Sequence, residues 1–142
     1  MYGHAAWLPM ALLGLAGCSA PASTAPRPGA AGDAPAQTGA RLYDANCTAC
    51  HQSDARGVPG VYPSLVGSPV ILGDPRQLAR WVVEGRRPPS LPPGRYPTAM
   101  LQFGWMKPAD AAALFTYLRS NFGNAAPPVE PAVVAQALGE EP

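Results

Sequence analysis

The sequence contains 142 residues, among them 19 prolines and 15 glycines, so it has room for one domain with a small core. Its 10 Lys and Arg residues nearly balance its 9 Asp and Glu residues, and they form no run long enough to favour nucleic acid as a partner. The charge is unevenly distributed, since residues 39–124 carry nine basic and five acidic side chains whereas the C-terminal residues are acidic.

An apolar segment, residues 5–17, opens the chain and is too short to span a membrane, for which about 20 residues are needed. Such a segment is typical of a signal peptide. It ends in Leu-Ala-Gly followed by Cys18, which resembles a bacterial lipobox and implies that Cys18 is acylated after cleavage. We therefore expect a lipoprotein signal peptide over residues 1–17 and a protein lipid-anchored to a membrane in the bacterial periplasm. The alternative is an ordinary secretory signal with an incidental cysteine, because no Lys or Arg precedes residue 5.

Two segments lack the apolar residues that a core requires. Residues 18–38 contain no large apolar side chain, so burial cannot offset the entropy lost on ordering them. We expect this segment to be a lipid-anchored, Pro/Ala-rich linker. Residues 125–142 form a second Pro/Ala-rich segment, acidic in charge, and we predict that this tail is disordered, with at most a marginal helix around residues 132–138.

The foldable region comprises residues 39–124, and three helices are predicted within it. The first covers residues 40–50. The second begins at Asp74, a favourable N-cap followed by Pro75 in the first turn. It carries Leu78, Trp81 and Val82 at helical spacing and ends at Gly85.

The third predicted helix has the clearest pattern. It begins near Pro108 and ends at Gly123. Its apolar stripe comprises Ala111, Leu114, Phe115, Leu118 and Phe122. Long Pro/Gly-rich loops separate the three helices, and three helices alone give a thin core. These features indicate an all-α domain whose core is completed by a bound group.

A Cys-x-x-Cys-His sequence, formed by Cys47, Cys50 and His51, is the attachment pattern of a c-type haem. The two thiols would bond to the vinyl groups of the porphyrin, and His51 would bind the iron. Zinc needs four ligands, and the chain beyond Cys18 has no further Cys or His. A redox dithiol would be expected in a βαβ context, and a disulfide would leave His51 unexplained.

The sixth position of the iron decides between electron transfer and ligand chemistry. No histidine follows His51, so the candidates are Met100 and Met106, or the position is open. Met106 lies two residues before Pro108, where an apolar residue commonly packs against the first turns of the helix. Met100 lies in an irregular loop, where its side chain is free to reach the iron. We therefore favour Met100 as the ligand.

The sequence resembles single-haem class I cytochromes c, and more narrowly the haem domains in cytochrome c subunits of membrane-bound bacterial alcohol, gluconate and sugar dehydrogenases. Four stretches carry the resemblance: YDANCTACHQSDARGVPGVYPSLVGS, VVEGRRPP, TAMLQFGWM and LFTYLRSNFGNAAPPV. It implies a small cytochrome c fold with three main helices and long loops wrapped around one covalently bound haem c. It also implies that Met100, 17 residues before Tyr117, binds iron, and that the carbonyl of Pro63 accepts a hydrogen bond from His51. Five residues are candidates for the haem propionates or a docking face: Arg86, Arg87, Arg95, Tyr96 and Trp105.

The function that follows from this resemblance is electron transfer. We expect an exported, membrane-tethered carrier of single electrons between a membrane-bound dehydrogenase and the respiratory chain, and not an enzyme in its own right. Its redox partners would be a membrane dehydrogenase, a quinol-oxidising complex or a terminal oxidase. The alternative is a haem protein with an open site that acts as a peroxidase-like enzyme or a sensor of small ligands.

Overall fold

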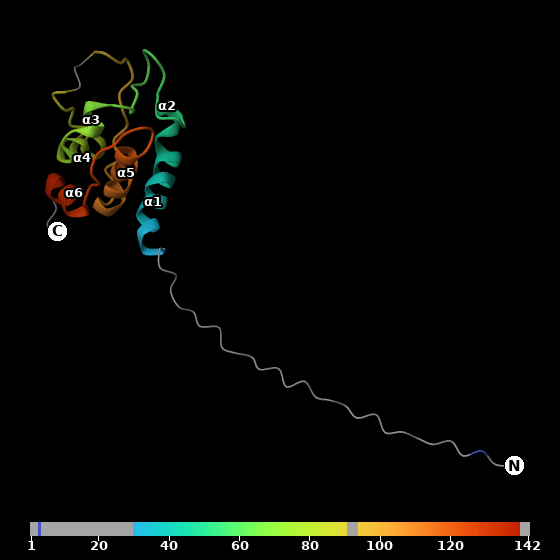
Figure 1. Cartoon of the computed structure of the whole chain (residues 1–142). Helices are drawn as coiled ribbons and strands as arrows, with labels where there is room; N and C mark the ends of the chain where they lie inside the picture. Colours follow the sequence, from blue (N-terminus) through green and yellow to red (C-terminus); the bar gives the residue numbers. More distant parts are fainter. Residues whose placement is uncertain (1–2, 4–29, 91–93, 140–142) are drawn as a thin grey trace.

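The computed structural model describes residue 3, residues 30–90 and residues 94–139, and Figure 1 shows the arrangement. Apart from residue 3, the predicted signal peptide lies outside these residues, as do Cys18 and the first part of the predicted linker. Within the described part of the chain all regular structure is helical, as expected for an all-α protein. The helices are α1 (Ala30–Asn46), α2 (Thr48–His51), α3 (Pro69–Leu72), α4 (Pro75–Glu84), α5 (Pro108–Ser120) and α6 (Pro131–Leu138). No helix in this part of the chain is both long enough and apolar enough to cross a membrane.

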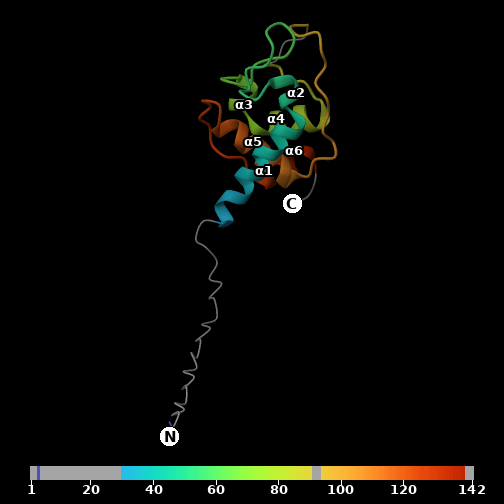
Figure 2. The same ribbon diagram turned by 90° about the vertical axis from the view of Figure 1, so that its right-hand side faces the viewer.

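The first helix is longer than predicted. It begins at Ala30, inside the segment expected to be a linker, and in Figures 1 and 2 its first turns extend beyond the other helices. The expectation of an unstructured linker is therefore wrong for residues 30–38. Four alanines among residues 30–38 favour a helix, although Pro35 lies inside it, and the later turns of α1 are held by packing.

Close packing against α5 holds the second half of α1 in place. Gly39 permits this approach, because a Cβ there would overlap the carbonyl oxygen of Ala113 and lie 2.7 Å from Cβ of Tyr117. One turn further along, the ring of Tyr43 lies 5.8 Å from that of Tyr117 and 5.1 Å from that of Phe122, measured between centroids. The glycine contact and the aromatic cluster fix how α1 crosses α5.

The second predicted helix is confirmed at both ends. The carboxylate of Asp74 accepts a hydrogen bond from the backbone N–H of Arg76 at 2.9 Å, and Gly85 ends α4 in a left-handed conformation with φ of 72°. The third predicted helix, α5, begins at Pro108 as expected but ends at Ser120, three residues before the predicted Gly123.

The C-terminal segment corrects the prediction of a disordered tail. Residues 131–138 form α6, which packs against both α4 and α5, and Val134 is completely buried. Two hydrogen bonds attach this segment: Arg80 Nε donates to the carbonyl of Ala137 at 3.1 Å, and the N–H of Val129 donates to the hydroxyl of Thr116 at 2.9 Å. The folded domain therefore continues past residue 124 to residue 139.

Two buried polar side chains bind loops to α5. The guanidinium of Arg119 donates to the carbonyl of Ile71 in α3, to that of Gly73 just after this helix, and to that of Pro127. The amide of Asn124 accepts from the N–H of Gly67 at 2.8 Å and donates to carbonyls of the same loop and of α5. Buried polar groups that are satisfied in this way fix loops that have few apolar contacts of their own.

Candidate functional site

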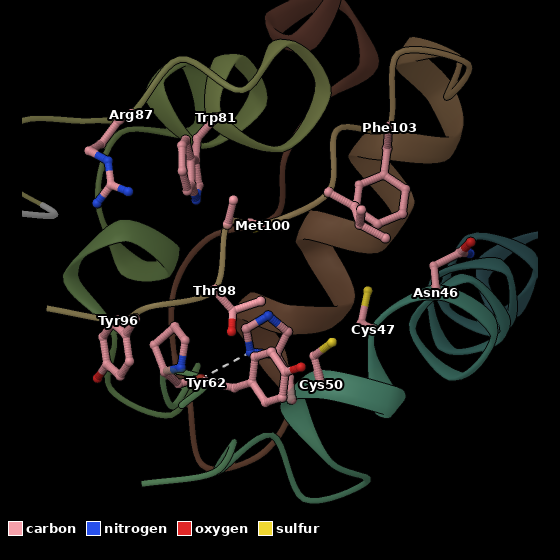
Figure 3. Close-up of a pocket in the computed structure, with 14 residues that line it drawn as sticks. Asn46, Cys47, Cys50, Tyr62, Trp81, Arg87, Tyr96, Thr98, Met100 and Phe103 are labelled. Atoms are coloured by element: carbon pink, nitrogen blue, oxygen red, sulfur yellow. Dashed lines mark hydrogen bonds between the residues drawn. The ribbon is translucent and has the colours of Figure 1, made fainter. Parts of the chain in front are cut away.

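A cavity lies where four parts of the chain meet: the end of α1 with α2, residues 62–63, residues 81–87 and residues 96–103 (Figure 3). Its larger part, the outer pocket, has an empty volume of about 1030 Å³, some of it open to solvent. A smaller part of about 590 Å³, the inner pocket, reaches toward α5. Both pockets are lined by Cys47, His51, Pro63, Trp81 and Met100, so they are two parts of one cavity.

The two cysteines lie at one edge of this cavity because the chain makes a tight turn there. The N–H groups of Cys50 and His51 both donate to the carbonyl of Cys47, at 3.2 and 2.8 Å. Both sulfurs are free thiols, and in the view of Figure 3 they lie across the outer pocket from Trp81 and Arg87. Burial, with a smaller contribution from the neighbouring Cys50, raises the pKa of Cys47 to about 11.

His51 is buried and its ring is oriented by a hydrogen bond. Nδ1 lies 2.9 Å from the carbonyl oxygen of Pro63, which can only accept, so Nδ1 carries the proton and Nε2 keeps its lone pair. Burial lowers the pKa of His51, while the bond to Pro63 opposes this shift. The neutral imidazole with a free Nε2 is the form that binds a metal.

The structure distinguishes the two candidate methionines. Met100 is partly buried and lines both pockets. Met106 is only 3% exposed, packs in the hydrophobic core and lines neither pocket. The loop that carries both is attached to α4, because the N–H of Phe103 donates to the carbonyl of Val82 at 3.0 Å.

The inner pocket is almost wholly apolar. Its walls come from the loop before α3, from α3, α4 and α5, and they include Leu65, Val70, Ile71, Leu78, Val82, Leu114 and Leu118. Sequence analysis assigned Leu78 and the α5 residues to the core stripes of two helices. The stripes are wide enough that some members pack between helices while others face the cavity.

The candidates for propionate binding or docking separate into two groups. Arg87 and Tyr96 line the outer pocket, and the guanidinium of Arg87 lies 5.3 Å from the ring centroid of Trp81. Arg86 pairs with Glu84 at 2.7 Å, Arg95 lies over the ring of Tyr96, and Trp105 is 61% exposed. None of these last three lines the outer or the inner pocket.

Several lining residues were not predicted, namely Trp81, Tyr62 and Thr98. Trp81 was interpreted only as a member of the apolar face of α4. The sequence feature that could have indicated this role is the arginine pair that follows Trp81. Gly85 ends the helix, and Arg87 then lies over the indole ring.

The residues present fit a covalently attached haem. The cavity offers two thiols, a neutral imidazole and a thioether, together with apolar walls that suit a macrocycle. Among the described residues no group of three or more His, Cys, Asp and Glu could hold a metal ion by itself. The two thiols would hold a haem covalently, and His51 with a second protein side chain would complete the binding of its iron.

Comparison with known proteins agrees with this chemistry, since the family model described as cytochrome c matches residues 36–122. The chain belongs to the cytochrome c family. Members bind covalently attached haem c, and the helical structure agrees with the cytochrome c fold.

The cytochrome c subunits of two kinds of dehydrogenase resemble this cytochrome. It is 32% identical over 103 residues to that of the quinone alcohol dehydrogenase of Gluconacetobacter polyoxogenes, covering 69% of this chain and 21% of the relative. The corresponding subunit of Gluconobacter oxydans (strain 621H) is 34% identical over 93 residues, or 63% and 19% of the two chains. The gluconate 2-dehydrogenase subunit of Pantoea cypripedii is 30% identical over 93 residues, or 63% and 21%. This cytochrome thus spans about a fifth of the length of these curated relatives.

Proposed function

We propose that this cytochrome carries single electrons through a haem attached at Cys47 and Cys50, with His51 and Met100 as the axial ligands of the iron. The observation that most supports this is that His51 and Met100 both line the two pockets of one cavity, whereas Met106 lines neither. A haem bound there supplies a one-electron Fe(III)/Fe(II) couple.

The residues of the chain set the properties of that couple. His51 presents Nε2 to the cavity because its Nδ1–H donates a hydrogen bond to the carbonyl of Pro63. The thioether of Met100 is a soft ligand that favours the ferrous state. The apolar inner pocket keeps water away from one side of the site, while the outer pocket leaves the other side accessible to a partner.

The partner would be a redox protein with an acidic docking surface. Residues 85–109 contain Arg86, Arg87, Arg95 and Lys107 but no Asp or Glu. Leu101, which lines the outer pocket, is 73% exposed. An exposed apolar side chain among cations suits the small, weak interfaces of redox encounters.

The relatives suggest which partners to test. They are named as cytochrome c subunits of alcohol and gluconate dehydrogenases. We therefore place this cytochrome between a membrane dehydrogenase and a quinol-oxidising complex or terminal oxidase. A lipid anchor at Cys18 in the bacterial periplasm would confine it to the membrane surface, and the resulting effective concentration would let weak contacts suffice.

The ligand assignment is tested by replacing each methionine separately. The ferric wild-type protein is expected to be low-spin and to show the long-wavelength charge-transfer band of methionine-bound haem iron. Met100→Ala should lose this band and gain carbon monoxide binding in the ferrous state, while Met106→Ala should keep the band and lose only stability. A high-spin wild-type protein that binds carbon monoxide readily at neutral pH would contradict the proposal and favour the peroxidase-like or sensor alternative.

A further inference from the structure

The loop after α2 contacts His51 at two points. Gly57 makes one of these contacts itself and lies directly against the residue that makes the other. The N–H of Gly57 donates to the backbone carbonyl of His51 at 2.9 Å. Six residues later, the carbonyl of Pro63 accepts from Nδ1 of the same histidine, also at 2.9 Å. The backbone and the ring of His51 are therefore fixed by one short loop that folds back on itself.

Gly57 lies so close to residues 62 and 63 of this loop that it has no room for a side chain. A Cβ at Gly57 would lie 2.5 Å from the carbonyl oxygen of Pro63 and 2.8 Å from its carbon, and it would also overlap the carbonyl oxygen of Tyr62. These are backbone atoms, so they cannot rotate away as the end of a flexible side chain would. Any side chain at Gly57 must displace the peptide group that binds His51.

The neighbouring turn prevents the loop from simply opening. The N–H of Val58 donates to the carbonyl of Tyr62 at 3.0 Å, and the N–H of Tyr62 donates back to the carbonyl of Val58 at 2.8 Å. This pair of bonds joins the two sides of the loop directly beside Gly57. A steric push at Gly57 is therefore transmitted to Pro63 instead of being absorbed by the turn.

We propose that Gly57 is a positioning residue that sets the donor strength of His51, because its missing side chain lets the carbonyl of Pro63 reach Nδ1. This inference rests on the part of the proposed function that assigns His51 as the proximal ligand, and it does not depend on Met100. A hydrogen bond from Nδ1 to a carbonyl makes the imidazole a stronger donor and stabilises ferric iron. Moving the carbonyl away should weaken that bond and raise the reduction potential.

Gly60 provides a matched control in the same loop. Both glycines have positive φ, +65° at Gly57 and +76° at Gly60, so an alanine is strained at either position. Only Gly57 has atoms in the way, since a Cβ at Gly60 would meet nothing within 4 Å. The difference between Gly57→Ala and Gly60→Ala isolates the contact with Pro63 from the backbone strain.

The test is the midpoint potential of the two haem-loaded variants, measured by spectroelectrochemical titration. Gly57→Ala should shift the potential upward, and its His51 Nδ1–H proton, observed by NMR, should exchange faster with D₂O. Gly60→Ala should keep the wild-type potential and exchange rate. Equal potentials in the two variants, or a downward shift confined to Gly57→Ala, would overturn the inference.

A second pair of variants keeps the test valid if the alanine variants fold poorly. Asparagine tolerates positive φ better than alanine, so Gly57→Asn and Gly60→Asn retain the steric test with less strain. The same upward shift is expected only at Gly57. If neither Gly57 variant attaches haem while both Gly60 variants do, Gly57 serves folding and the inference is refuted. If the wild-type protein lacks the charge-transfer band of methionine-bound haem iron, the Met100 assignment is refuted, but the comparison of the Gly57 and Gly60 variants is unaffected.

Discussion

Replacing Arg119 with lysine tests the role of a buried cation that has no carboxylate partner among the described residues. Arg119 is 5% exposed, and its charge is balanced by three backbone carbonyls. Nη1 donates to Ile71 at 2.7 Å and to Gly73 at 2.9 Å, and Nε donates to Pro127 at 2.8 Å. Ile71 also lines the inner pocket, so this cluster connects the core to the candidate haem site.

The expected cost follows from the geometry of the two side chains. A lysine keeps the charge, but its single ammonium cannot replace donors at both Nε and Nη1. It loses at least the bond to Pro127, and a hydrogen bond to a charged group contributes about 1.5–3 kcal/mol. We therefore expect Arg119→Lys to lower the free energy of unfolding by about 2–3 kcal/mol. For a domain of this size the melting temperature should fall by roughly 10 °C.

Guanidinium denaturation of the haem-loaded protein, followed by far-UV circular dichroism, measures this loss. Arg76→Lys is the control, because Arg76 is an exposed residue of α4 whose replacement should stay within about 0.5 kcal/mol of wild type. If Arg119→Lys is as stable as Arg76→Lys, the three carbonyl contacts contribute nothing specific and the reasoning is wrong.

Three further predictions concern other parts of the molecule. Val134→Ala should lower the stability of the whole domain by about 2 kcal/mol in a single transition, and an unchanged denaturation curve would show that α6 is not part of the core. Burial raises the pKa of Tyr43 from 10.0 to about 12, so the unfolded chain releases this proton first and stability should fall as the pH rises from 10 toward 12. In Tyr43→Phe the free energy of unfolding should decrease less over this pH range than in the wild type. If denaturation curves give the same dependence on pH for both proteins, the prediction is wrong. Oxidation of the reduced protein by anionic ferricyanide should slow as ionic strength rises from about 0.01 M to about 0.15 M, and replacing both Arg95 and Lys107 by glutamine should weaken that dependence, which stopped-flow spectroscopy measures.

Local sequence signals were reliable where one residue determines one structural feature. Asp74 with Pro75 defined the start of α4, and Gly85 defined its end, because a cap and a left-handed residue act through their immediate neighbours. The Cys-x-x-Cys-His sequence likewise located one edge of the cavity. These features need no information about distant parts of the chain.

Features that depend on tertiary contacts could not be predicted in the same way. Residues 131–138 are too few to form a stable helix by themselves, so α6 depends on its packing against α4 and α5. Arg119 was counted among the basic side chains because nothing beside it in the sequence reveals its bonds to the carbonyls of Ile71 and Gly73, more than 40 residues earlier. Trp81 was assigned to a helix face, and its second role appears only when residues 96–103 fold over it.

The crossing of α1 and α5 also determines the folding topology of the site. The 61 residues from Cys47 to Lys107, which include α2, α3 and α4, connect α1 to α5, and these two helices pack against each other beside Gly39 and the aromatic cluster. Closing a loop of this length costs about 3.6 kcal/mol of chain entropy beyond a constant term. Every residue assigned to the haem lies within that loop. The packing of these two helices therefore stabilises the arrangement in which His51 and Met100, 49 residues apart in the sequence, line the same cavity, and contacts of such large sequence separation slow folding.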